Sequence, residues 1–390
     1  MKSLYDDTIA QQYSNDPLGM RVYTSQLLGQ SKELVLHGGG NTSVKIDEIL
    51  YVKGSGWNLD TIEIPGFSPV NLNTLIKMAG CESLSDVQMV KEQRAAMSDQ
   101  SFPNPSIEAI LHAIIPFDFV DHTHADAVVT LTNTPNGKEL MEEIYGKNML
   151  LIDYVMPGFL LAKHIYNETL NIDWNALDGI ILLNHGVFTF DNNAKKAYEK
   201  MITIVTKAEE YLQANVTLPC PDCPGESDPV MIQKIADAVS QVRGTPIFPI
   251  AIDSPRAKLL SLFPHLKRLV KQGGLTPEHV IRIKPFPAII EDDITQGIET
   301  FTKEYQAYFD KNSKPEHICL DLAPRYCFIK GVGAVALGKD EKESRIIADI
   351  VSHTITAILC GEQLGAWISL SLADMFEMEY WELEQAKLKK

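Results

Sequence analysis

Apolar residues in the first half of the chain fall into short runs of strand length, separated by longer stretches with helical spacing. The short runs predict strands at residues 34–37, 49–53, 117–129, 149–154 and 180–183. Helical spacing predicts helices that begin at Leu84 and at Pro105, and a long amphipathic helix over residues 194–212. Strands that alternate with helices in this way are typical of an α/β domain.

The pattern changes at residues 219–229, where proline is too frequent for a regular element. We therefore predict a first domain over residues 1–218, a proline-rich linker over 219–229 and a second α/β domain over 230–390. In the second domain, helical spacing predicts helices over residues 230–242, 295–310, 341–359 and 371–390. Short apolar runs predict strands over residues 247–252, 279–284, 326–329 and 334–337.

Composition and charge narrow the possible classes of protein. The 390 residues are 45% hydrophobic and 22% charged, which is ordinary for a globular chain with more than one core. A net charge of -16 argues against nonspecific binding to nucleic acid or to an anionic membrane, because it leaves no basic surface for phosphates. No apolar run reaches membrane-spanning length, and the N-terminus lacks the apolar core of a signal peptide. Six cysteines without regular spacing predict a protein of the reducing cytoplasm.

Three histidines near predicted strand ends are the first candidates for chemistry. His122 and His124 are two residues apart, so on a strand both imidazoles point to the same side. His185 follows the apolar run at 180–183 and precedes Gly186. A lone strand histidine is usually an ordinary core or surface residue. Three imidazoles with an open fourth position suit a catalytic Zn²⁺ site, although manganese, cobalt or iron would also fit.

Glu108 is the candidate acid or base beside these histidines. It lies in the first turn of the helix predicted at Pro105, where the helix dipole favours an acidic residue even without catalysis. Close to a metal ion, the same carboxylate could remove a proton from carbon or oxygen as a general base. His112 follows one helical turn later, as a second partner of the site or as ordinary packing.

Two glycine-rich segments are candidates for binding an anion. Gly38–Gly40 directly follows a predicted strand, and Lys53–Gly56 adds a lysine to a similar loop. Glycines let the backbone approach a ligand closely and turn its N–H groups toward an anion. Together with Ser106 the two loops predict a phosphate cradle, and neither has the spacing of a Walker motif.

Five separated motifs occur in an order that resembles the class II aldolase/adducin family. They are Gly40-Asn41-Thr42-Ser43, Lys53-Gly54-Ser55-Gly56, Pro105-Ser106-Ile107-Glu108, His122-Thr123-His124-Ala125 and Asn184-His185-Gly186. The resemblance covers about the first 215 residues and implies a three-layer αβα fold there. It also implies that His122, His124 and His185 bind zinc and that Glu108 is the acid/base residue. The phosphate-binding positions that it implies are Gly40, Asn41, Lys53, Ser55, Gly56 and Ser106. Ile107 stands where the family often has a second serine.

The longer motif His37–Lys45 resembles a narrower group, the aldolase halves of bifunctional rhamnulose-1-phosphate aldolase/short-chain dehydrogenase proteins. In that group the resemblance continues through residues 220–390, so we expect an aldolase part without the dehydrogenase half. The implied reaction cleaves a ketose 1-phosphate to dihydroxyacetone phosphate and an aldehyde, through an enediolate that the metal stabilises. A phosphosugar 4-epimerase and a non-catalytic adducin-like scaffold are the alternatives. The family implies a homo-oligomer, a tetramer, and a tyrosine proton donor for which Tyr145 and Tyr154 are candidates.

Other motifs favour structural interpretations. The glycines of Gly331–Gly338 do not have the spacing of a dinucleotide fingerprint, so we expect a turn in a Rossmann-like domain without a working nucleotide site. Cys220 and Cys223 lack the second pair that a zinc ribbon needs and fit the linker better. Arg256 and Arg325 each follow a proline and are only weak candidates for binding an anion in the second domain.

Overall fold

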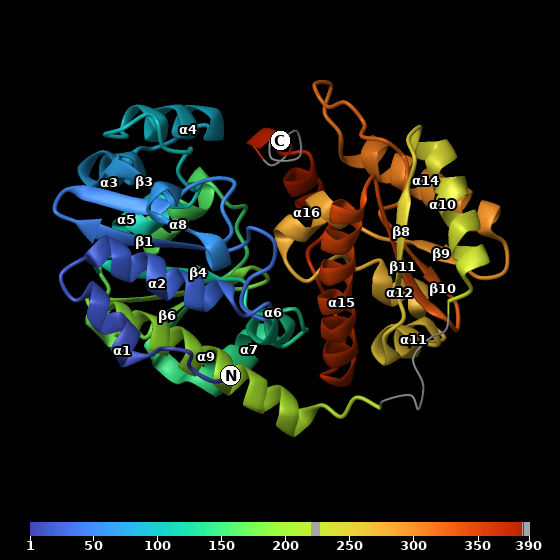
Figure 1. Cartoon of the computed structure of the whole chain (residues 1–390), viewed down its shortest axis with the longest axis horizontal. Coiled ribbons are helices and arrows are strands. Elements are labelled where there is room, and N and C mark those ends of the chain that lie inside the picture. The colour runs from blue at the N-terminus through green and yellow to red at the C-terminus, as the bar shows by residue number, and fades with distance from the viewer. Residues whose placement is uncertain (220–226, 384, 386–390) are drawn as a thin grey trace. The chain divides into compact units, whose positions relative to one another are not determined.

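The computed structural model describes residues 1–219, 227–383 and 385, and these form two compact units (Figure 1). The first unit comprises Met1–Thr132 and Asn136–Leu212, and the second comprises Asn133–Pro135 and Gln213–Lys390. Residues 220–226, the centre of the predicted linker with its two cysteines, lie outside the described residues.

A seven-stranded mixed sheet forms the centre of the first unit, in the order β3-β2-β1-β4-β7-β6-β5. The strands are β1 (Asn41–Ile46), β2 (Ile49–Lys53), β3 (Phe67–Asn71), β4 (Phe119–Thr123), β5 (Met149–Ile152), β6 (Gly179–Leu182) and β7 (Gly186–Asp191). Only β5 and β6 pair in parallel, and every other neighbouring pair in this sheet is antiparallel. The central strands β1 and β4 therefore lie side by side although a long stretch of chain separates them.

Helices cover both faces of this sheet. On one face, α2 (Pro17–Gly29) and α9 (Ala194–Asn215) pack against β1 and β4. On the other face lie α3 (Leu72–Gly80), α5 (Ala109–Ile114) and α8 (Phe159–Glu168). Side chains alternate along β4, so that Phe119 and Asp121 face α2 while Val120 and His122 face α5. The three-layer αβα arrangement is thus confirmed.

Four further helices complete the first unit. They are α1 (Asp7–Ala10), α4 (Asp86–Ala95), α6 (Asp126–Thr132) and α7 (Gly137–Tyr145). Ser85 and Gln88 form a capping box at the start of α4, which stabilises the helix predicted there. Two residues, Leu84 and Ser85, thus precede the first helical residue Asp86.

The second unit is also an α/β domain, as predicted. Its four-stranded sheet has the order β8-β11-β10-β9, with β8 (Phe248–Ile252), β9 (Ala288–Ile290), β10 (Tyr326–Ile329) and β11 (Gly333–Gly338). β9 pairs with β10 in parallel, whereas the turn at Gly331 makes β10 and β11 an antiparallel hairpin. This hairpin makes the sheet mixed, unlike the parallel sheet of a nucleotide-binding Rossmann domain.

Helices cover this second sheet on both faces. One face carries α10 (Pro229–Arg243), α14 (Ile294–Asn312) and α16 (Leu372–Glu379), and the other carries α11 (Pro255–Ser261) and α15 (Glu341–Gln363). The short helices α12 (Leu266–Val270) and α13 (Val280–Ile283) lie between β8 and β9 in the chain. Among the described helices, α15 alone is long and apolar enough to cross a membrane, and 61% of its most apolar window is buried inside the structure, as in a core helix.

Two predicted strands are wrong, and a third is confirmed only in its first half. Residues 34–37 form turns, in which the N–H groups of Leu34 and Val35 donate to the carbonyl of Ser31. The predicted strand 117–129 ends at Thr123, and its second half belongs to helix α6. Residues 280–283, predicted as a strand, form α13. Both of these last two segments are short and apolar-rich, and such a segment fits a buried helix as well as a buried strand, so periodicity alone could not separate them.

The helix predicted at Pro105 starts later than its sequence indicates. The first helical residue is Ala109, and Glu108 precedes it with φ −90° and ψ 9°. Pro105 instead forms an isolated bridge with Gly54, which joins this segment to the end of β2. The shift matters because it places Glu108 just before the helix, beside the histidines described below.

Candidate metal centre

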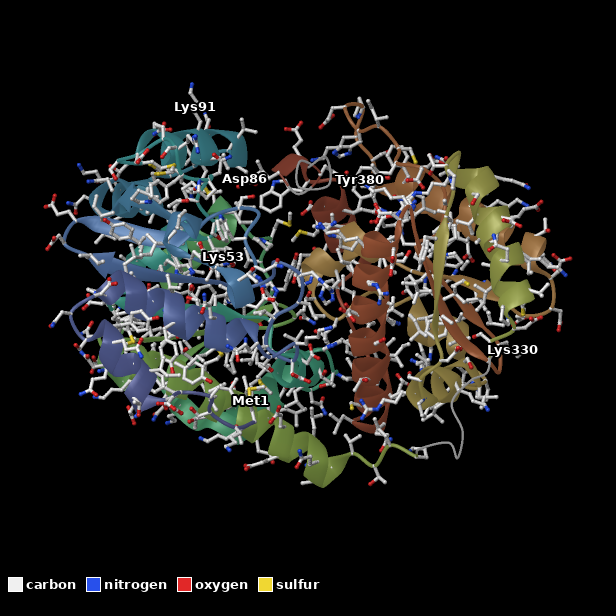
Figure 2. The ribbon with its side chains drawn as sticks, in the orientation of Figure 1. Met1, Lys53, Asp86, Lys91, Lys330 and Tyr380 are labelled. Atoms are coloured by element: carbon white, nitrogen blue, oxygen red, sulfur yellow. The ribbon has the colours of Figure 1, made fainter. Side chains whose placement is uncertain are left out.

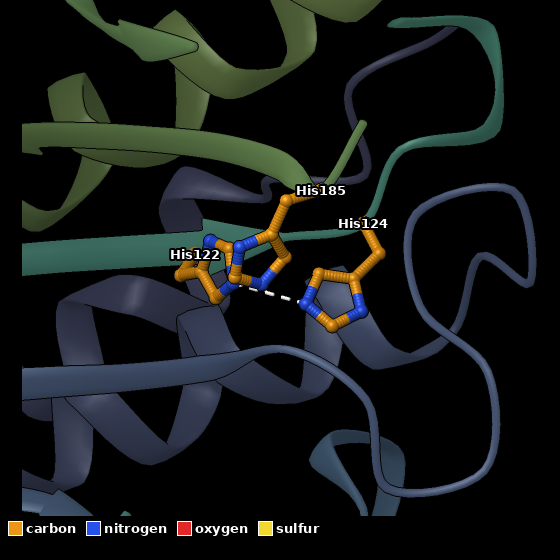
Figure 3. A group of neighbouring side chains, drawn as sticks. All are labelled: His122, His124 and His185. Carbon is orange, nitrogen blue, oxygen red and sulfur yellow. Dashed lines mark hydrogen bonds between the residues drawn. The ribbon is translucent and has the colours of Figure 1, made fainter. Parts of the chain in front are cut away.

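Three histidines converge at one end of β4 and β7. His122 is the fourth residue of β4, His124 lies just beyond the strand, and His185 lies in the turn between β6 and β7. One ligand nitrogen from each ring can be chosen so that all three lie within 4.8 Å of one another (Figure 3). The Nε2 atoms of His122 and His124 are 3.0 Å apart. The structure therefore brings the three predicted ligands together, although His124 lies beyond the end of β4 and not on a strand as predicted.

Gly186 permits the close approach of these rings. A Cβ atom at this position would lie 2.4 Å from the carbonyl oxygen of Thr123 and 3.0 Å from carbon atoms of both the His122 and the His124 rings. Asn184, the residue before His185, has φ 60°. Few residues other than glycine and asparagine adopt this left-handed conformation, and the turn that it forms places His185 in the cluster. The Asn-His-Gly sequence is thus a geometric requirement of the cluster.

The orientation of His122 is fixed by its neighbours on β7. Its Nδ1 lies 3.0 Å from the carbonyl oxygen of Val187, and since a carbonyl only accepts, Nδ1 carries the proton and donates. The lone pair of Nε2 is then directed toward the other two histidines. The ring also stacks on Phe188 with centroids 4.0 Å apart. A backbone carbonyl that holds the second imidazole nitrogen in this way is typical of histidine ligands of metal ions.

Glu108 contributes a carboxylate to the same cluster. Its Oε2 lies 3.5 Å from Nε2 of His122, and its Oε1 lies 3.7 Å from Nε2 of His185. The residue is only 6% exposed, and Oε1 has no hydrogen-bond partner. A buried carboxylate oxygen without a donor costs free energy unless a cation or a ligand proton satisfies it. This open oxygen beside the cluster of three imidazoles therefore fits a divalent transition-metal ion.

Asn41 and His112 connect Glu108 to the sheet. The Nδ2 group of Asn41 donates to Oε2 of Glu108 at 2.6 Å, and its Oδ1 lies 2.5 Å from Nε2 of His112. The Nδ1 atom of His112 lies 2.7 Å from Oγ of Ser43. Complete burial lowers the pKa of His112 well below its usual value, so this imidazole is neutral. The sequence pointed to His112 only through its position one turn after Glu108.

A buried ion pair that the sequence did not reveal lies on the opposite face of β4. Nη1 of Arg21, on α2, is 2.6 Å from Oδ1 of Asp121, and both side chains are fully buried. Burial raises the pKa of Asp121 and lowers the pKa of Arg21, and the partner's charge opposes each shift. Because Asp121 directly precedes His122, this pair anchors the strand segment that carries a candidate metal ligand.

The two predicted phosphate loops lie close to the Glu108 segment. The N–H of Ser55 donates to the carbonyl of Asn104, and the N–H of Ser106 donates to the carbonyl of Lys53. Nζ of Lys53, labelled in Figure 2, donates to the carbonyl of Gly38 at 3.0 Å. The loops are therefore joined by their own backbone, and several amides expected to face an anion donate within the protein. A phosphate at these loops would therefore be bound mainly by side chains and less by backbone N–H groups.

The remaining predicted phosphate residues have different surroundings. Gly40 has φ 63°, and a Cβ atom there would lie 2.7 Å from the carbonyl oxygen of His122, so this glycine lets the loop pass beside the metal ligand. Gly56 is exposed, with φ 92° and open space around it. The Oγ atom of Ser106 accepts the N–H of Glu108 at 3.2 Å and so helps to shape the backbone before α5.

The candidate tyrosines are placed elsewhere. The hydroxyl of Tyr145 donates to the carbonyl of Ile204 at 2.7 Å, and burial raises its pKa. Tyr145 lines a cavity of about 310 Å³ together with residues of α9. The Tyr154 hydroxyl lies 3.9 Å from Sδ of Met156.

A second cavity, of about 280 Å³, lies in the second unit. Neither cavity contains a residue of the histidine cluster, whose assignment rests on its donor atoms and not on its size.

Two arginines of the second unit were weak candidates for binding an anion. Arg325 is held by an ion pair with Asp321 at 2.5 Å. Nη1 of Arg256 donates to Oγ1 of Thr356 at 3.0 Å. The charge of Arg325 is therefore compensated within the protein.

Comparison with known proteins matches both units to one superfamily. Residues 21–212 match the family described as "Class II Aldolase and Adducin N-terminal domain", and residues 226–388 match "Aldolase class II, second domain". The solved N-terminal class II aldolase domain of a conserved protein from Thermoplasma acidophilum is 36% identical, with a TM-score of 0.50, and covers 54% of this chain and 99% of that one.

A curated relative extends the match to the whole chain. The uncharacterized oxidoreductase YuxG of Bacillus subtilis (strain 168) is 30% identical over an alignment of 432 residues that includes all of this chain. The chain spans 60% of the length of that relative. With the histidine cluster, these matches show that the chain belongs to the class II aldolase superfamily and joins an N-terminal class II aldolase/adducin domain to an aldolase class II second domain.

Proposed function

We propose that this chain is a divalent-metal-dependent aldolase that cleaves a ketose 1-phosphate, of the rhamnulose 1-phosphate kind, into dihydroxyacetone phosphate and an aldehyde. The observation that carries the proposal is the unpartnered Oε1 of Glu108, buried 3.7 Å from Nε2 of His185. A carboxylate that faces three imidazoles without a hydrogen-bond donor is suited to a cation and to the proton of a substrate.

His122, His124 and His185 would hold the ion, with zinc as the proposed metal. When bound, the ion supplies a Lewis acid that polarises the substrate carbonyl and stabilises the negative charge formed when the carbon–carbon bond breaks. Glu108 is held by the N–H of Asn41 at Oε2, which leaves Oε1 to exchange a proton with the substrate carbon. Burial of Glu108 excludes bulk water from that transfer.

The phosphate of the substrate would be held by side chains at the joined loops. Lys53 supplies a positive charge, and Ser55 and Ser106 supply hydroxyl donors on loops that hydrogen-bond to each other. Ile107 offers no hydroxyl, so this phosphate would have one donor fewer than in relatives with two consecutive serines.

The superfamily match supports the aldolase chemistry over the other classes. Both units match aldolase families, whereas the printed name of YuxG, an oxidoreductase, refers to a longer protein of which this chain matches 60%. We propose that the part shared between this chain and YuxG carries out the carbon–carbon cleavage. A non-catalytic scaffold would have no use for three imidazole nitrogens gathered within 4.8 Å.

The test is the release of dihydroxyacetone phosphate from a panel of ketose 1-phosphates by zinc-loaded protein. The matched control is Glu108→Gln, which keeps the shape of the side chain and should keep zinc while losing exchange of the dihydroxyacetone phosphate C3 proton with solvent. Release that this substitution abolishes would support the proposal and name the substrate. Isomerised sugar without release would favour a 4-epimerase, and neither product from fully zinc-loaded protein would overturn both.

A further inference from the structure

Four buried side chains form one chain of hydrogen bonds that ends at the metal centre. Ser43 and Asn41 lie two residues apart on β1 and point to the same face of the sheet. His112, on α5, lies between them, and Asn41 contacts Glu108. Asn41, Ser43 and His112 are at most 7% exposed, so water does not compete for these bonds.

The direction of each bond follows from the carboxylate. An ionised carboxylate accepts only, so the amide of Asn41 must turn its NH₂ toward Glu108 and its Oδ1 toward His112. The Oδ1 accepts only, so the proton of the neutral imidazole lies on Nε2 of His112. The Nδ1 of His112 is then an acceptor, and the hydroxyl of Ser43 donates to it. For a neutral imidazole, one arrangement of protons satisfies every member.

We propose that His112, acting through Asn41, is a positioning residue that fixes the rotation of the Glu108 carboxylate, so that Oε2 is held and Oε1 faces the histidine cluster. This inference rests on the proposed function of Glu108 as the acid/base residue. It also gives Asn41 a role beside the metal ion: its side-chain amide is engaged by Glu108 and His112, so its orientation serves the carboxylate.

The alternative is that His112 is present only to fill space. Its ring packs edge-on against Phe188 with centroids 5.5 Å apart, and Phe188 in turn stacks on His122. Loss of the imidazole would therefore disturb the site by repacking even if the hydrogen bonds were unimportant. The test has to separate the donor at Nε2 from the volume of the ring.

Two substitutions make that separation. His112→Gln keeps an N–H donor the same number of bonds from Cα as Nε2 of histidine, while His112→Leu keeps comparable volume without any donor. We expect His112→Leu to lower the rate of Glu108-dependent proton exchange by about 10- to 100-fold, the range for losing a partner of a metal-site group. His112→Gln should restore the rate to within about 3-fold of wild type. Equal losses in the two variants would overturn the proposal.

A second readout does not depend on catalysis. Zinc affinity, measured by competition with a chromophoric chelator, is compared for wild type, His112→Leu, Glu108→Gln and the double variant. If His112 acts through the carboxylate, His112→Leu changes the affinity when Glu108 is present and causes no further change in the Glu108→Gln background. The same change in both backgrounds would refute the relay.

The two readouts also separate the inference from the proposed function. If wild type neither cleaves a ketose 1-phosphate nor exchanges the proton, the proposed function fails, while the affinity cycle still decides whether His112 positions Glu108. If wild type is active and the cycle is additive, the function stands and the relay fails.

Discussion

Asn41 lies directly opposite His122 in the antiparallel pairing of β1 with β4. One strand thus supplies a proposed metal ligand, and its neighbour supplies the amide that holds the proposed acid/base carboxylate of Glu108. Because the register of two paired strands is fixed by backbone hydrogen bonds, the distance between these groups does not depend on flexible loops. Strand register therefore positions these two members of the site.

Removing a ligand should remove the metal ion. We expect His185→Ala, and equally His122→Ala, to lose both zinc and activity, because two imidazoles leave too few donors for a stable site. The measurement is zinc content by atomic emission after dialysis, with circular dichroism to check folding. His164→Ala, on α8 and outside the cluster, is the control and should retain zinc. A His185→Ala protein with one tightly bound zinc per chain would contradict the ligand assignment.

Adding one methyl group at Gly186 should disturb the cluster. The Cβ atom would meet the carbonyl of Thr123 at 2.4 Å and both neighbouring imidazoles at 3.0 Å, so strand or rings must shift. We expect Gly186→Ala to cost about 1–3 kcal/mol of stability and to weaken zinc binding at least tenfold, from the usual cost of overpacking. The control is Gly80→Ala, at the end of α3, where the new atom meets nothing within 4 Å. Isothermal zinc titration of both variants decides; equal affinities would show that the approach of the rings is not tight.

The ion pair between Arg21 and Asp121 should be sensitive to removal of one partner. Arg21→Met leaves a fully buried carboxylate without its cation, and such changes typically cost about 3–5 kcal/mol. Hydrogen exchange of the amides in β1 and β4 measures the loss without assuming that both units unfold together. Lys195→Met, which removes an exposed ion pair with Asp7, is the control and should change protection far less. If the two variants lose equal protection, the buried ion pair stabilises the sheet no more than the exposed ion pair does.

The stability of the second unit should depend on pH through Glu379. Burial, partly opposed by the charge of Lys284, raises the pKa of Glu379 to about 7, and Tyr305 donates to its Oε1 at 2.8 Å. Between about pH 4.5 and 7 the folded state keeps a proton that the unfolded state releases, so the stabilisation is present at low pH and is lost as pH rises through 7. A shift of this size corresponds to about 3 kcal/mol.

Glu379→Gln carries no titrating group and should not show this decline. We expect the stability of wild type relative to the variant to fall between pH 5 and pH 8, measured by hydrogen exchange in α14 and α16. Parallel pH profiles for the two proteins would mean that Glu379 does not hold a proton in the folded state.

The sequence predicted which histidines gather at the site better than it predicted the elements and contacts that hold them. The residue types were recognisable because metal-binding histidines and an acidic partner occur in short local motifs, and the structure gathers His122, His124 and His185 as expected. Long elements with clear periodicity, such as α9 and α15, and the buried strand β10 were also predicted. Local patterns determine these features because they need only neighbouring residues.

The tertiary structure decided which partners those residues meet. The pairing of β1 with β4 and of β4 with β7 joins segments distant in the sequence, and the second pairing brings Val187 to His122. Packing of the segment before α5 against the sheet brings Glu108 to Asn41. The tertiary structure also places the apolar residues 127–131, predicted as part of a strand, in helix α6. By itself the sequence determined the α/β class, the candidate metal ligands and the carboxylate of Glu108, because residue type and spacing are enough to recognise them. Only the tertiary structure determined that Asn41 and His112 hold the carboxylate of Glu108, since these hydrogen bonds join residues of separate elements.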